Sequence, residues 1–193
     1  MCFLLLFSVF NTAQSLAAKV LSDLGFGNLG FYSLAVLYFS FALSCLVASA
    51  IVNKMGERFS LAVGSQCYTL YISSFALAAA SAEKPDSNSW FLNSTFISSA
   101  ILIAAAANGF GAAILWTAQG RYVSRIASES NKGTFFGVFW VFLMLNFIVG
   151  VLGGAFALKN VNPFSFYLGM TLLSFVSCLF FLCLRPVQPN EED

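Results

Sequence analysis

Residues 29–52 read LGFYSLAVLYFSFALSCLVASAIV and contain no charged side chain. A helix rises about 1.5 Å per residue, so about 20 apolar residues cross the roughly 30 Å hydrocarbon core of a bilayer. This stretch is long enough to do so. It therefore predicts a transmembrane helix, and other charge-free apolar runs of about this length predict further ones.

Similar apolar stretches recur along the whole chain. Hydrophobic residues make up 59% of the 193 residues and charged residues 9%, against about a quarter charged in soluble domains. Spanning segments must satisfy their backbone groups internally, and these stretches are far longer than barrel strands. We expect an all-α membrane protein, with a six-helix transmembrane bundle over residues 1–185 and a polar acidic tail over 186–193. The expected helices cover residues 1–18, 29–52, 61–80, 91–118, 135–158 and 164–184.

The basic residues predict the orientation of the bundle, because Lys and Arg are retained on the cytoplasmic side of a membrane. The more basic side carries Lys54, Arg58, Arg121, Arg125, Lys132 and Arg185. The other side carries Lys19, Lys84 and Lys159. Both termini are therefore expected in the cytoplasm, and the sequence leaves plasma membrane and internal membranes undecided.

Two processing signals lie near predicted helices. The first apolar stretch is short and is followed by Ala17 and Ala18, which leaves a cleaved signal peptide as the alternative. It has no basic start and contains the polar Asn11 and Gln14, which favours a first transmembrane helix. Residues 93–95 read NST, a glycosylation sequon on the predicted outer side, so Asn93 is a candidate acceptor close to a helix.

Composition excludes several classes of function. The net charge of +1 offers no basic field for nucleic acid. The chain has no histidine, which removes the commonest metal ligand and general base. No nucleophile, base and orienting group converge at a recognisable spacing. We therefore expect no enzyme activity, no metal and no cofactor.

Polar side chains inside the predicted helices indicate where the bundle meets a partner or a cavity. Asn11, Gln14 and Ser15 share one face of the first helix. Buried amides need partners, so this face is expected to point inward. A candidate central cavity is expected from Asn11, Gln14, Tyr38, Asn108 and Asn146, with Gln66 and Thr69 nearby. The alternative is that these amides only join helices, through hydrogen bonds worth about 0.6 kcal/mol each.

The predicted spans also lack something that ion-coupled carriers need. No acidic, basic or histidine side chain lies deep within any of them. Such carriers place an ionisable group near the midplane, so these six helices by themselves are expected to supply no coupling site of that kind. A site for a neutral solute remains compatible. Small residues at 133 and 137, and at 150 and 154, fit the spacing of closely packed helices. Packing within the chain is the favoured interpretation.

Residues 49–58 read SAIVNKMGER, which resembles the loop between helices two and three of the major facilitator superfamily. Asn53 stands where that pattern usually has aspartate, so the usual salt bridge is not implied. The resemblance, together with the region after the fourth predicted helix, gives the candidate cytoplasmic gating residues. These are Asn53, Lys54, Gly56, Arg58, Gln119 and Arg121.

Further phrases resemble the uncoordinated-93 (Unc-93-like) family of ion-channel regulatory proteins. They are FNTAQ at 10–14, LAVLY at 34–38, LWTAQG at 115–120, NKG at 131–133 and FGVFW at 136–140. The resemblance covers the amino-terminal half of the family, whose full-length members are similar to twelve-helix facilitators.

The resemblance implies two functions. The favoured one is an accessory subunit that packs against a channel or receptor in the lipid bilayer. The alternative is half of a facilitator for a neutral small solute, which needs a second six-helix half because alternating access moves one repeat against another.

Overall fold

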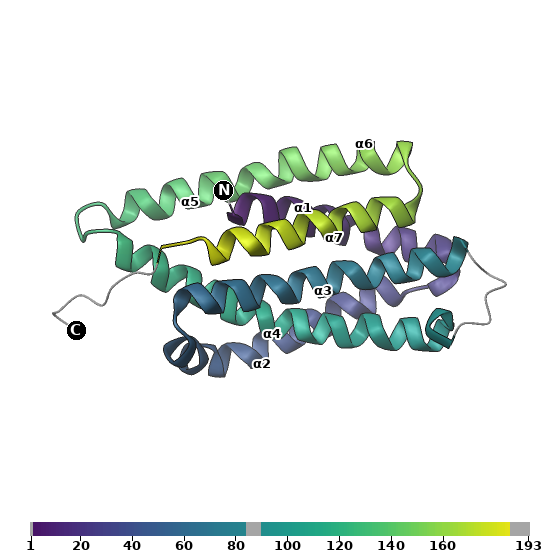
Figure 1. The fold of residues 1–193 in the computed structure, drawn as a ribbon, viewed down its shortest axis with the longest axis horizontal. Coiled ribbons are helices and arrows are strands. Elements are labelled where there is room, and N and C mark those ends of the chain that lie inside the picture. Colours follow the sequence, from purple (N-terminus) through teal and green to yellow (C-terminus); the bar gives the residue numbers. More distant parts are fainter. Residues whose placement is uncertain (1, 84–89, 186–193) are drawn as a thin grey trace.

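The computed structural model describes residues 2–83 and 90–185, and the predicted tail over 186–193 lies outside them. The described residues form helices and no strands, which confirms the all-α class. Figure 1 shows the helices running along one long axis. In chain order the elements are α1 (Cys2–Leu21), η1 (Ser22–Phe26), α2 (Leu29–Met55), α3 (Glu57–Glu83), η2 (Trp90–Leu92), α4 (Ser94–Ile126), α5 (Lys132–Asn146), η3 (Phe147–Val151), α6 (Leu152–Asn160) and α7 (Pro163–Leu182).

The predicted number of six helices is not confirmed, because the described residues contain seven α-helices. The predicted helix over 135–158 is divided between α5 and α6 by η3, a π-helical turn. Hydropathy measures how apolar a stretch is and carries no information on its hydrogen-bond spacing, so this division is invisible in the sequence. The elements α5, η3 and α6 still follow one another in line, and we call them the α5–α6 rod (Figure 1).

Four helical segments of the described chain are long and apolar enough to cross a membrane. They are Cys2–Phe26, α2, α4 and α7, while α5 is apolar but shorter. The helix α3 has the length but more polar residues, among them serines whose hydroxyl groups bond to carbonyls one turn earlier. Ser65 donates to Ala62 at 2.8 Å and Ser74 donates to Tyr71 at 2.6 Å. Because these hydroxyl groups bond to carbonyls of their own helix, the serines can be buried inside the bundle without partners on other helices.

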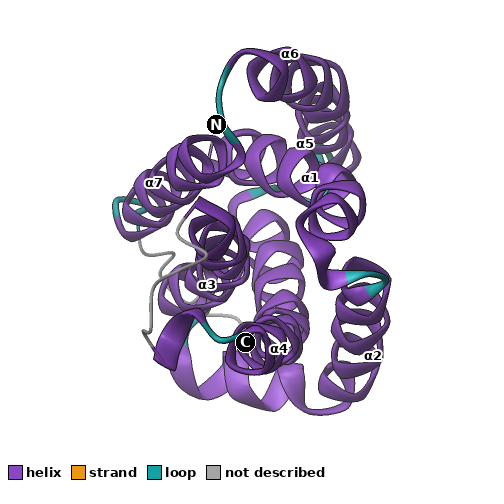
Figure 2. Ribbon diagram, turned by 90° about the vertical axis from the view of Figure 1, so that its right-hand side faces the viewer, coloured by secondary structure: helices purple, strands orange, loops and turns teal. Residues whose placement is uncertain are grey.

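The helices pack in a symmetric pattern. The helix α2 lies along α4, and the α5–α6 rod lies along α1. Likewise α3 packs on α4 while α7 packs on α1, and α3 and α7 pack on each other. Figure 2 shows α2 and the α5–α6 rod at the periphery of the bundle. The contacts of α1, α2 and α3 are therefore repeated by α4, the α5–α6 rod and α7, in that order.

Glycines permit the closest approaches between helices. A Cβ atom on Gly109 of α4 would overlap the backbone of α2 at Leu37. On the α5–α6 rod, a Cβ atom on Gly150 would lie 2.6 Å from the Ser8 carbonyl oxygen, and one on Gly154 would overlap Thr12. The small residues at 150 and 154 are therefore used within the chain. No atom lies within 4 Å of such a Cβ at 133 or 137.

The outer face of the bundle is apolar. Only 17% of the most apolar part of α2 is buried inside the protein. Its large exposed side chains include Phe31, Phe39, Leu43 and Leu46. Water would disfavour such a continuous surface, whereas lipid tails do not, so α2 has the surface of a membrane helix.

Candidate functional site

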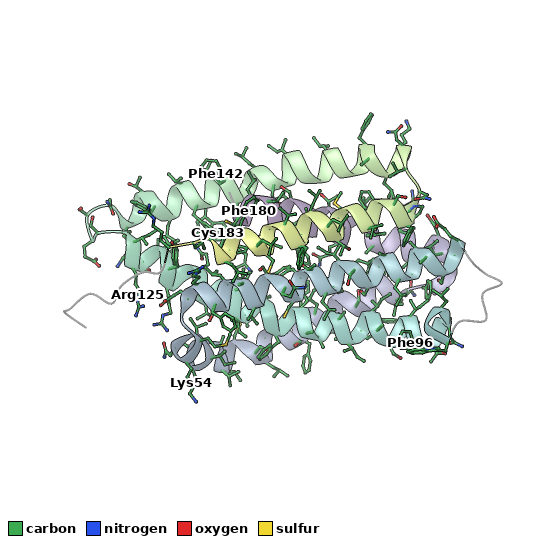
Figure 3. The ribbon with its side chains drawn as sticks, viewed as in Figure 1. Lys54, Phe96, Arg125, Phe142, Phe180 and Cys183 are labelled. Atoms are coloured by element: carbon green, nitrogen blue, oxygen red, sulfur yellow. The ribbon has the colours of Figure 1, made fainter. Side chains whose placement is uncertain are left out.

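The predicted gating residues gather at one end of the bundle, where α2 passes into α3 and α4 leads to α5. We call it the basic end; it carries the labelled Lys54 and Arg125, and Phe96 lies at the opposite end (Figure 3). The connection between α2 and α3 is the single residue Gly56. Its φ of 77° lies in the left-handed region that favours glycine. Its backbone N–H donates to Val52 at 2.9 Å and closes the end of α2.

Three charged side chains and one amide meet beside this turn, and we call Asn53, Glu57, Arg121 and Arg125 the charge cluster. The Glu57 carboxylate forms ion pairs with both arginines, 2.9 Å from a terminal nitrogen of Arg125 and 3.4 Å from the Nε atom of Arg121. Arg121 also donates to the side-chain oxygen of Asn53. The Glu57 side chain is only 10% exposed, whereas the two arginines are 30% and 31% exposed. The cluster joins α2 and α3 to the end of α4 around one nearly buried carboxylate.

Sequence reasoning missed two members of the cluster, Glu57 and Arg125. Arg125 follows Arg121 by four residues and therefore shares its helix face. Glu57 lies in the first turn of α3, where the helix dipole favours a carboxylate. Both signals were present in the sequence, but neither residue was among the predicted gating residues.

The other predicted gating residues lie apart from the cluster. Arg58 donates to the carbonyl of Leu182 and so ties the start of α3 to the end of α7. Lys54 is exposed and forms no ion pair within the described residues. Gln119 is 94% buried and lines a separate cavity at the basic end. The sequence predicted one group of gating residues. In the fold Arg58, Lys54 and Gln119 lie in three different places outside the cluster.

Two of the predicted central amides are bonded to each other across the bundle. Asn11 of α1 donates to the side-chain oxygen of Asn146 at 2.6 Å. Asn146 is fully buried and donates in turn to the carbonyl of Leu143. It is the last residue of α5, so the pair lies where the π-helical turn η3 begins. We call Asn11 and Asn146 the amide pair.

A cavity of about 200 Å³ adjoins the amide pair and is lined mainly by aromatic side chains. Asn11 and Tyr38 both line it, and Tyr38 is 60% exposed. Gln14 is half-buried and does not line it. Asn108 is fully buried and outside the lining, and neither of its amide atoms has a partner among the described residues. Two of the five predicted central residues therefore share this cavity.

Gln66 and Thr69, which were predicted near the central cavity, do not lie together in the fold. Gln66 is exposed, while Thr69 bonds to Ser174 at 2.8 Å and joins α3 to α7.

An aromatic layer lies between this central cavity and the one at the basic end. Phe7 and Trp116 line the central cavity, and Phe3 and Phe139 line the other. The ring centroids of Phe7 and Trp116 are 5.1 Å apart, and those of Phe3 and Phe139 are also 5.1 Å apart. Phe3 and Trp116 lie 6.1 Å apart and complete the layer. Such contacts are favourable edge and offset arrangements of aromatic rings.

Asn93, the candidate acceptor for glycosylation, is exposed and begins α4. Its side-chain oxygen accepts from the backbone N–H of Thr95 at 2.8 Å. The residue therefore already caps the helix, and its modification stays a prediction.

Comparison with known proteins places this arrangement in a family. Residues 27–192 match the family described as ion channel regulatory protein UNC-93. The chain belongs to the UNC-93 family. It is 28% identical to the UNC93-like protein MFSD11 of Xenopus tropicalis, over 99% of this chain and 41% of the frog protein. It is 31% identical to UNC93-like protein 3 of Arabidopsis thaliana, over 90% of this chain and 38% of the plant protein.

Protein unc-93 homolog A of Bos taurus is 29% identical over 72% of this chain and 28% of the bovine protein. The chain thus spans less than half the length of these relatives. No solved structure matches it significantly. Family membership and the apolar helices make this chain a multi-pass integral membrane protein.

Proposed function

We propose that the chain is an accessory, regulatory subunit of an ion channel in a membrane. The observation that carries this proposal is the amide pair, in which Asn11 and Asn146 satisfy each other at 2.6 Å. A solute site needs polar groups that face an open cavity and wait for a ligand. Here the amide pair holds α1 against the α5–α6 rod, which is what a structural scaffold requires.

The charge cluster supports the same proposal. Glu57 holds two arginines of α4, and Asn53 accepts a bond from one of them. Charges arranged in this way fix the basic end of the bundle and leave Lys54 exposed for contacts outside it. The exposed apolar face of α2 supplies a surface within the bilayer on which a channel subunit can pack.

The proposed topology has six passes and both ends in the cytoplasm. Counting the α5–α6 rod as one pass, successive helices run in opposite directions, and the chain enters and leaves at the same side of the bundle (Figure 1). The basic end would then face the cytoplasm, in agreement with the distribution of Lys and Arg.

A second candidate function is half of a facilitator that carries a neutral solute. The observation that favours it is the central cavity, which Asn11 and Tyr38 both line. The symmetric packing of the helices also fits the repeats of such carriers. This function needs a second half, since the chain spans 41% of the frog relative.

The two functions are separated by one experiment on cells that express the chain with and without a set of potassium channels. The accessory function predicts that channel current changes and that the channel co-purifies after cross-linking. Leu46→Asp, which places a charge on the exposed face of α2, should abolish both effects. The double variant Asn11→Leu/Asn146→Leu, which leaves neither amide without its partner, should keep both.

Uptake of neutral solutes should stay at background. Saturable uptake that Asn11→Ala abolishes, without any effect on channel current, would overturn the proposal in favour of the carrier.

A further inference from the structure

The cavity at the basic end contains an unused polar group. Its volume is about 200 Å³, and it lies between α1, α4, α5 and α7. Its walls include Phe3, Phe142, Leu143 and Phe181, and none of the described residues that line it is charged. It is separate from the amide pair and from the charge cluster, so neither part of the proposed function accounts for it.

Gln119 is the side chain that makes this cavity unusual. It lines the cavity and is 6% exposed, and its Nε2 atom is enclosed without an acceptor. None of the side-chain hydrogen bonds of the described residues uses its amide. The nitrogen and oxygen of an amide differ little in shape, so rotation of the group presents either a donor or an acceptor to the same space. Burial of an amide without a hydrogen-bond partner destabilises the protein. A ligand that bonds to this amide would remove that unfavourable free energy and so bind more tightly.

Tyr122 does not supply the missing partner, although it lines the same cavity. Its hydroxyl donates to the carbonyl of Arg185 at 3.3 Å. The amide of Gln119 is therefore the polar group that remains available in an otherwise apolar space.

We propose that this cavity binds a neutral and largely apolar molecule, through one hydroxyl or carbonyl group held by the amide of Gln119. The part of the lining that the structure describes is uncharged, which disfavours an anion or a cation, because no opposite charge there would compensate for its desolvation. The volume lies below the roughly 300–1,000 Å³ of sites for drug-sized ligands. The ligand is therefore a short-chain alcohol or ester, or the corresponding segment of a neutral lipid.

The ligand can reach the cavity from the bilayer. Ile126 of α4 and Phe142 of α5 line the cavity and are each 45% exposed. Both side chains therefore form part of the lipid-facing surface as well as the wall. A molecule dissolved in the bilayer would pass between the ends of α4 and α5.

The test uses the whole chain in lipid nanodiscs and three probes with the same chain length: 1-octanol, octane and octanoate. Binding is followed by the rise in the midpoint of thermal unfolding. The wild-type chain should bind 1-octanol about fivefold more tightly than octane, as one added hydrogen bond allows. Octanoate should bind more weakly than octanol.

Gln119→Leu provides the decisive comparison, because leucine keeps the approximate volume and removes the amide. The variant should still bind octane, and its preference for octanol over octane should disappear. Partition into the bilayer is the same for both proteins and cancels in this ratio. An unchanged preference, even with a changed unfolding midpoint, would overturn the proposal, since it would show that Gln119 acts on stability alone.

Filling the entrance gives an independent test. Ile126→Trp should reduce binding of both octane and octanol, whereas Leu46→Trp, on the exposed face of α2, should leave both unchanged. Equal binding by the two tryptophan variants would place the ligand elsewhere and overturn the proposal.

The natural source of the ligand is then read by mass spectrometry of lipid extracted from protein purified directly from membranes. A neutral lipid retained by the wild type and lost from Gln119→Leu identifies a bilayer lipid. An intact octanol preference without a retained lipid identifies a free apolar alcohol or ester.

Discussion

The charge cluster and the amide pair join helices in opposite ways. At the basic end, Glu57 interacts with two arginines, and Arg121 also bonds to Asn53. The arginines are about one third exposed, so water can replace part of any bond that is lost. In the interior, Asn11 depends on one partner, Asn146, which has no exposed surface. The cluster is redundant and hydrated, whereas the amide pair depends on one bond and is only partly accessible to water.

This difference predicts where each region is sensitive. In the cluster, the critical group is the carboxylate that all the charges share, and each arginine has a substitute. In the amide pair, removal of either side chain leaves the other amide without its hydrogen-bond partner. Removal of both leaves no unpaired amide. Double variants should therefore distinguish the two regions. In the cluster a second mutation should add to the loss of stability caused by the first, and in the amide pair it should cancel that loss.

The largest effect is expected for Glu57→Gln. It leaves Arg121 and Arg125 facing each other without their shared carboxylate, which should cost about 2–3 kcal/mol. The loss is smaller than for a fully buried pair because both arginines are partly hydrated. Thermal unfolding in detergent micelles measures it. Glu129→Gln is the control, because Glu129 is exposed and its ion pair within the described residues is with Lys132. Equal midpoints for the two variants would show that the cluster is not organised around Glu57.

Asn146→Leu should come next, at about 1–2 kcal/mol, because it leaves the donor of Asn11 unpaired beside a mostly aromatic cavity. The double variant Asn11→Leu/Asn146→Leu should recover most of that loss. A double-mutant cycle on the unfolding midpoint gives the coupling energy between the two positions. Additive losses would mean that the amide pair contributes nothing as a pair.

Arg121→Lys should cost about 0.5–1 kcal/mol, since lysine keeps the charge but cannot reach Asn53 and Glu57 with the planar donors of arginine. Arg125 would still hold Glu57 at 2.9 Å, so the loss should stay well below that of Glu57→Gln. A loss as large as that of Glu57→Gln in the same unfolding assay would contradict the redundancy of the cluster.

Asn53→Asp is expected to have the smallest effect and the opposite sign. It converts the bond between Asn53 and Arg121 into an ion pair at a partly exposed site, which should stabilise the protein by about 0.5 kcal/mol at low salt. Salt should remove the gain. A destabilised variant would indicate that Glu57 and a second carboxylate repel each other.

The sequence predicted the helical class and the family because both depend on properties that a single chain displays. Charge-free stretches such as 29–52 leave little choice but a membrane helix, and the short phrases of the first five predicted helices are sufficient to indicate the family. The family match over residues 27–192 confirms that prediction.

The sites were harder to predict, since they depend on how helices are placed relative to one another. Asn11 and Asn146 were both expected inside, yet nothing in the sequence showed that each was the partner of the other. Glu57 was not among the predicted site residues, because its two arginines lie on another helix and the sequence does not show that they meet it. Gln66 was expected inside on polarity alone, and it lies on the exposed side of α3.

The π-helical turn η3 sets the rotational phase of everything that follows it in the α5–α6 rod. A hydrogen-bonded π-turn holds one residue more than an α-turn, so removing one residue from Phe147–Val151 would let α5 and α6 join as one continuous α-helix. Gly154 would then still face Thr12, and Asn146 would still reach Asn11. The π-turn therefore lets the rod carry an extra residue while both of these contacts with α1 are kept.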